Sequence, residues 1–179
     1  MADIDFETIL CDSSRSLADY VTSVVGADPQ LFDQVLDLAL ELKPRISMRA
    51  ARVADLACLK HPELIRPRLA EIAGLLPDIT DHSVRRILLH ILIRHPWVED
   101  EDAMGRLVET LLTWLQDERQ DLAARSYSIN MMEKICEVEP MLGRELALVL
   151  QESLPGWNSV TLRKQGQKVL TRLMKEHEF

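Results

Sequence analysis

The sequence predicts an all-α protein, a solenoid of about four helix pairs preceded by an N-terminal capping helix. Apolar residues recur at three- and four-residue intervals along most of the 179-residue chain, as in helices that bury one face. Leucine and alanine are abundant, aromatic residues make up 4% of the chain and glycines number six, a composition that favours helices. An arginine motif also recurs roughly every 40 residues, the length of a two-helix repeat.

Caps and helix breakers define the elements in order. Asp28 and Pro29 begin a helix as its N-cap and first residue. The prolines after His61 and His95 end two others, because a residue before proline is driven out of the α region. The predicted helices span residues 14–25, 28–42, 47–60, 63–76, 81–94, 99–118, 121–138, 141–154 and 159–176. Only short turns join them, so we expect a single domain over residues 1–179.

The repeat is clearest when the second helix of each pair is aligned on an arginine. The segments AAR, VRR, AAR and TLR place these arginines 34, 39 and 38 residues apart, at Arg52, Arg86, Arg125 and Arg163. The residues five positions before them are Ser47, Asp81, Gln120 and Asn158. Serine, aspartate and asparagine are good N-caps, and glutamine is not. The alignment therefore predicts four second helices that begin in a similar way.

This pattern resembles HEAT repeats, which form armadillo-type α-α superhelices, over roughly residues 28–175. The small-small-arginine segments carry the resemblance, together with Pro67 in a first helix, where HEAT repeats are often bent. The tetratricopeptide pattern fits less well, because its Trp-Leu-Gly-Tyr spacing is missing. The resemblance implies a right-handed solenoid whose second helices line a concave face. It also implies that the helix over residues 14–25 covers the N-terminal end.

Basic side chains on the second helices are the candidate partner-binding residues. On the resemblance, the concave face carries Arg49, Arg52, Arg86, His90, Arg125 and Arg163. Such a surface suits an acidic peptide or a carboxylate-rich partner protein, through bidentate arginine contacts. Alternatively, the arginines pair with carboxylates of the neighbouring repeat and hold the turns together. Candidate mates are Asp55, Asp81, Asp117 and Asp121.

His90 shares one helix face with Arg86 and Arg94, at intervals of four residues. A cationic neighbourhood suits a proton donor or acceptor, but the sequence shows no carboxylate or nucleophile at a spacing that completes a catalytic set. A packed histidine is the alternative. No histidine spacing matches a metal site, and six glycines leave no phosphate-binding loop, so we expect neither cofactor nor metal.

Charge and cysteine usage indicate the kind of partner and compartment. The net charge of −8 argues against nucleic acid as the main partner, because duplex-DNA binders present a basic surface. Cys11, Cys58 and Cys136 form no disulfide framework, and the last two are expected to be small buried hydrophobes. The first ten residues are acidic and lack a basic segment followed by an apolar one, so we expect no signal peptide, and no apolar run reaches the ~20 residues of a membrane span. We therefore expect a cytoplasmic protein with no membrane partner.

Three further features have two interpretations each. Trp97 and Trp157 follow prolines and are either exposed anchors for a partner or edges of the core, whereas Trp114 is expected in the core. The acidic residues 99–102 suit a solvated first turn of a helix. The last helix has a basic side that suits a membrane surface, a partner groove or the polar end of a solenoid, formed by Lys164, Lys168, Arg172 and Lys175.

The function that this fold implies is a non-catalytic protein-interaction or scaffold module that binds another protein. The alternative is an enzyme of the alkylpurine DNA glycosylase type, a family of HEAT-like proteins with a basic DNA-binding groove. The arginines favour that alternative. The acidic net charge, the short chain and the lack of a matching Trp-Asp-Arg set argue against it.

Overall fold

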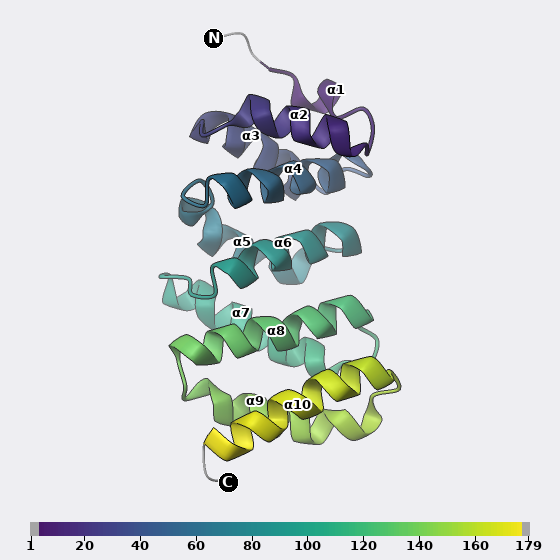
Figure 1. The fold of residues 1–179 in the computed structure, drawn as a ribbon, viewed down its shortest axis with the longest axis vertical. Coiled ribbons are helices and arrows are strands. Elements are labelled where there is room, and N and C mark those ends of the chain that lie inside the picture. Colours follow the sequence, from purple (N-terminus) through teal and green to yellow (C-terminus); the bar gives the residue numbers. More distant parts are fainter. Residues whose placement is uncertain (1–3, 177–179) are drawn as a thin grey trace. The chain divides into compact units, whose positions relative to one another are not determined.

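The computed structural model describes residues 4–176, which form ten α-helices and three short 3-10 turns without a β-strand (Figure 1). In order these are α1 Phe6–Ile9, α2 Arg15–Val25, α3 Pro29–Leu40, α4 Ile46–Lys60, η1 Arg66–Arg68, α5 Leu69–Leu75, η2 Leu76–Asp78, α6 His82–Arg94, α7 Glu101–Gln116, α8 Leu122–Val138, α9 Leu142–Ser153, η3 Leu154–Gly156 and α10 Val160–Glu176. Within this described part, no helix has both the length and the apolar character needed to cross a membrane. The all-α prediction is confirmed.

Most helices begin at a side chain that accepts a hydrogen bond from the first turn. Ser14 caps α2, Asp28 caps α3, Asp100 caps α7 and Asp121 caps α8. Such caps satisfy backbone N–H groups that have no partner inside the helix. Gly26 ends α2 with φ of 53°, a conformation that side chains with a Cβ rarely adopt. These boundaries follow the sequence prediction closely, because capping depends on residues only a few positions apart.

The helices cluster into two compact units. Among the described residues, the first contains 4–69 and 78–91 and the second contains 70–77 and 92–176. All three boundaries fall within helical elements, α5, η2 and α6, and not in a linker. The single domain over residues 1–179 stays a prediction.

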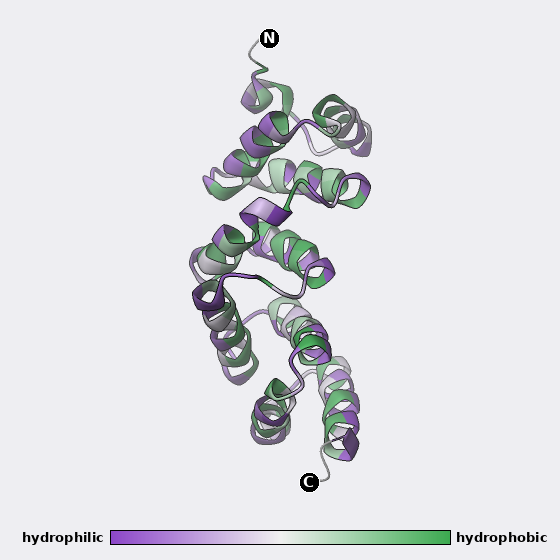
Figure 2. Cartoon of the chain, turned by 90° about the vertical axis from the view of Figure 1, so that its left-hand side faces the viewer, coloured by the Kyte–Doolittle hydropathy of each residue, from purple (hydrophilic) through white to green (hydrophobic). Residues whose placement is uncertain are grey.

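Within each unit the core lies between paired helices. In the first unit α3 and α2 both pack on α4, and in the second α7 packs on α8 and α9 on α10. Contacts between α7 and α9 and between α8 and α10 join the last two pairs. Figure 2 shows the physical basis, because individual helices are hydrophobic along one side and hydrophilic along another. A pair of this size cannot cover its own apolar faces, so it packs on the next pair.

Two local predictions were wrong. Ser47 is not an N-cap, because α4 begins after Arg45, which has φ of 70° and no side-chain cap bond. The Ser47 hydroxyl is instead buried and donates to the Leu38 carbonyl at 2.7 Å, tying α4 to the end of α3. Pro67 does not bend a continuous helix over residues 63–76. It lies in η1, directly before the short helix α5, where the missing N–H of proline costs no helical hydrogen bond.

Candidate functional site

The arginines of the repeat occupy one equivalent position, but the register differs from the sequence alignment. The second helices α4, α6, α8 and α10 begin after Arg45, Asp81, Asp121 and Ser159. The backbone N–H four residues later donates to the carbonyl of each of these starting residues, at 2.9–3.2 Å. The residues at this fourth position are Arg49, Arg85, Arg125 and Arg163.

The alignment therefore missed Arg85 and shifted the first two repeats. Arg52 and Arg86 lie three residues and one residue beyond the equivalent positions. Counting from the caps would have revealed the register, because Asp81 and Asp121 each precede an arginine by four residues. Gln120 and Asn158, used in the alignment, each stand one residue before the actual cap.

In the first unit, Arg49 and Arg52 hold the segment that precedes α2. Arg49 donates to the Leu10 carbonyl at 2.8 Å and to the Ser13 hydroxyl at 3.2 Å. Arg52 donates to the Ser13 carbonyl at 3.2 Å. Both side chains are half-buried. These bonds tie residues 10–13 to α4 and stabilise the fold, whatever else the two arginines do.

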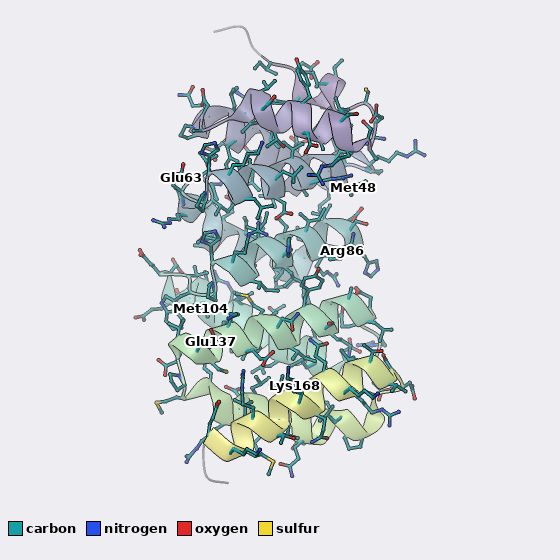
Figure 3. All side chains as sticks on the ribbon, in the orientation of Figure 1. Met48, Glu63, Arg86, Met104, Glu137 and Lys168 are labelled. Atoms are coloured by element: carbon teal, nitrogen blue, oxygen red, sulfur yellow. The ribbon has the colours of Figure 1, made fainter. Side chains whose placement is uncertain are left out.

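Neighbouring residues on α6 have contrasting environments. Arg85 is 9% exposed, and its Nε and Nη2 donate to the Ile79 carbonyl at 2.9 and 2.7 Å. Arg86 points outward and is exposed (Figure 3), without a hydrogen bond or ion pair to any residue in the described part of the chain. His90 is also exposed, and its Nδ1 lies 3.3 Å from Asp55 Oδ2 on α4. Asp55, a predicted mate of the arginines, thus pairs with the histidine.

In the second unit, Arg125 is buried. Its side chain is 4% exposed, its guanidinium lies 4.6 Å from the centre of the Trp157 ring, and Nη2 donates to the Leu115 carbonyl at 3.4 Å. Burial lowers the pKa of Arg125, and the negative charges of Glu118 and Asp117 partly oppose the shift. Arg125 therefore joins α8 to the C-terminal end of α7, at Leu115, and to the segment that follows α9, at Trp157.

Three of the four predicted carboxylate mates form bonds with residues close to them in sequence. Asp81 and Asp121 accept from backbone N–H groups of the first turns of α6 and α8, at 2.8–3.0 Å. Asp117 accepts from Arg119 Nε at 2.9 Å. Arg49, Arg85 and Arg125 each donate to a backbone carbonyl, so the structural interpretation of the arginines holds in this modified form.

Arg163 is exposed on α10. It lines a shallow hollow of about 430 Å³ together with Lys164, Gln167 and the apolar residues Leu154 and Val160. Lys168, labelled in Figure 3, is exposed on the same helix. Figure 3 also places Met104 on α7, a helix that lines the groove described next.

An open groove of about 730 Å³ lies between α7 and α9 and continues to the segment before α7. Its apolar lining comprises Trp97, Val98, Met104, Val108, Leu112, Leu142 and Val149. Its acidic lining comprises Glu99, Glu101, Glu109 and Glu145, and none of its lining residues is basic. Trp97 is 41% exposed, whereas Trp114 and Trp157 are 5% and 2% exposed. The sequence did not decide whether Trp97 and Trp157 are exposed anchors or edges of the core. In the structure Trp97 is exposed and Trp157 is buried.

Cysteine reactivity provides a test of the packing around Cys136 in the second unit. Cys58 and Cys136 are buried, as predicted, and Cys11 is exposed. Burial raises the pKa of the Cys136 thiol to about 11. Because the thiolate is the reactive form, we expect iodoacetamide at about pH 8 to modify Cys11 in the folded protein and leave Cys136 unmodified. Mass spectrometry after digestion measures both sites, and full modification in urea is the control. Equal rates at Cys11 and Cys136 would contradict the packing of α8.

Comparison with known proteins identifies the family. The model of the HEAT repeat domain matches residues 9–173, which is most of the chain and includes α2 to α9 and nearly all of α10. No curated protein and no solved structure matches the chain significantly. The paired helices, the equivalent arginines and the family match agree, and the chain belongs to the HEAT repeat domain family, with an all-α, HEAT-like solenoid fold.

Proposed function

We propose that the chain is a non-catalytic protein-interaction module that binds a partner protein in the groove between α7 and α9. HEAT repeat domains are modules of the protein-interaction and scaffold type. The observation that carries the proposal is the open apolar groove itself, with a large aromatic side chain, Trp97, exposed at one end. Trp97 is 41% exposed, whereas Met104, Val108, Leu112 and Val149 are 5–9% exposed and form the floor of the groove. Tryptophan is enriched among the residues that dominate binding energy, so Trp97 is the expected anchor for a partner.

The arginines of the second helices are weaker candidates for the partner site. Arg49 and Arg52 donate to backbone groups of the first unit, and Arg125 is buried. A partner that used these guanidinium groups would have to replace bonds that hold the fold together. Arg86 and Arg163 are exposed and suit an acidic partner. The acidic-peptide surface therefore stays a prediction, with fewer residues available than the sequence indicated, and so does the cytoplasmic location.

Gly105 allows the groove to be blocked without disturbing the core. It lines the groove from α7, is exposed, and a Cβ at this position would meet no atom within 4 Å apart from its own helix and chain neighbours. Gly105→Phe therefore places a large side chain at the groove. Gln151→Phe adds the same ring to an exposed position of α9 that does not line the groove, and is the matched control.

The test is affinity capture from a lysate of the source organism with the full chain and these two variants, followed by quantitative mass spectrometry. We expect at least one protein to be retained equally by the wild type and Gln151→Phe. Its recovery with Gly105→Phe should fall about tenfold or more. Equal recovery of every captured protein by all three chains would contradict binding in the groove.

A further inference from the structure

We infer that the groove between α7 and α9 takes an amphipathic helix of the partner protein, with its apolar face inward and lysine or arginine residues along its flanks. This inference rests on the proposed function, because it names the chemistry of the partner at the same site. It is argued from the shape of the groove, from the order of residues along α7 and from the charge of the lining.

The order of residues on α7 places an apolar row beside an acidic one. Met104, Val108 and Leu112 follow one another at four-residue intervals, and all three line the groove. Residues four apart on a helix lie one above the other, so the small parts of these side chains that reach the groove, 5–9% of each residue, form a continuous apolar floor. Glu101, Gly105 and Glu109 form a second row with the same interval, also in the lining. A partner that contacts the apolar row therefore meets carboxylates at its edge.

The opposite wall repeats this arrangement. Leu142 and Val149 on α9 are seven residues apart, which places them on one face of the helix, and Glu145 lies between them in sequence. The groove thus has apolar residues and at least one carboxylate on each wall. A groove between two helices accepts the ridge of a third, and such grooves bind amphipathic helices through apolar anchors at intervals of three, four and seven residues.

The charge of the lining decides which amphipathic helix fits. The four carboxylates, Glu99, Glu101, Glu109 and Glu145, are exposed and form no ion pair with any residue between 4 and 176. Glu101 and Glu145 lie in first turns, where the helix dipole already favours negative charge. Glu109 lies in the middle of α7, where the dipole does not account for it. Basic residues on the partner would offset the mutual repulsion of these carboxylates and set its orientation and register.

The test uses a displayed library of helical peptides with a constant apolar face and lysine, glutamine or glutamate at the flanking positions. The immobilised full chain selects from it. We expect enrichment of peptides with basic flanks, and about tenfold weaker binding when the lysines of a selected peptide are replaced by glutamates. Binding should also weaken several-fold between about 50 and 500 mM salt, because exposed charges are screened.

Charge reversal on the protein tests the same inference from the other side. The double variant Glu109→Lys/Glu145→Lys should select peptides with acidic flanks. Glu152→Lys, on an exposed part of α9 outside the groove, is the control and should keep the basic preference. Affinities can be measured by Trp97 fluorescence, because the other two tryptophans are buried, and the Trp97→Phe variant should lose the signal.

The outcomes separate this inference from the proposed function. Enrichment of neutral or acidic peptides that Gly105→Phe abolishes would overturn the basic partner and leave the groove as the binding site. Enrichment that Gly105→Phe does not change would overturn the groove and, with it, the proposed function. If light scattering shows a dimer of the wild type that Gly105→Phe converts to a monomer, the occupant is a second copy of the chain, and the partner helix is wrong.

Discussion

Arg125→Ala is expected to lower the free energy of unfolding by about 3 kcal/mol, the largest effect we predict for a single side chain. The guanidinium is 4% exposed, stacks on the Trp157 ring and donates to the Leu115 carbonyl. Its removal leaves a cavity against the indole and takes a charged hydrogen bond from the carbonyl. Urea denaturation followed by far-UV circular dichroism measures the change.

Two substitutions separate the causes of that loss. Arg125→Met fills most of the same space without burying a charge, so we expect it to destabilise less than alanine. Methionine also removes the cost of burying Arg125 Nε, which has no hydrogen-bond partner in the described part of the chain. Arg119→Ala removes a side chain that is 91% exposed and should cause no measurable change. Unchanged stability of Arg125→Ala would contradict its structural role and return Arg125 to the candidates for partner binding.

Gly166→Ala and Gly105→Ala are expected to change stability in opposite directions. A Cβ at Gly166 would lie 2.8 Å from Leu154 Cδ2 and 2.9 Å from Trp157 Cζ3, closer than carbon atoms approach without displacement. Overpacking of this kind costs about 1–3 kcal/mol, which exceeds the ~1 kcal/mol that alanine contributes over glycine in a helix. We therefore expect Gly166→Ala to destabilise the protein by about 1–2 kcal/mol.

Gly105 is the matched control for this prediction. It also lies inside a long helix, α7, but an added Cβ meets no atom within 4 Å apart from its own helix and chain neighbours. Only the backbone effect remains, so Gly105→Ala should raise the free energy of unfolding by about 0.5–1 kcal/mol. Thermal and urea unfolding of both variants measure the difference. A stabilising effect of Gly166→Ala would mean that α10 packs less tightly on the turn at Trp157 than the structure shows.

The boundaries of most helices were predictable because their signals are local. Ser14 and Asp28 cap helices by accepting bonds from residues two or three positions ahead, and Gly26 ends α2 through its own backbone conformation. Arg45 carries no such signal. It begins α4 with a positive φ and without a side-chain cap, so the prediction that used Ser47 as the cap was wrong. The same error shifted the arginine register in the first repeat.

The candidate site was predictable only in part. The acidic residues 99–102 and Trp97 were visible in the sequence, but each also had a plain structural explanation. The groove combines α7 with α9, and its apolar rows include residues such as Met104 and Leu142 that any helix of the core contains. Sequence alone cannot tell which residues of a buried apolar row also form the floor of an open groove, because both kinds of row have the same period.

The sequence by itself determined the all-α class, the two-helix repeat, most helix ends and the recurrence of arginine, because periodicity and capping act over a few residues. Only the tertiary structure decided which arginines are bound internally and where an apolar surface stays open. Arg49 meets a carbonyl 39 residues away, and Arg125 meets Trp157 from the next helix pair. Such contacts depend on how helices pack against one another, and residues far apart in sequence set that packing together.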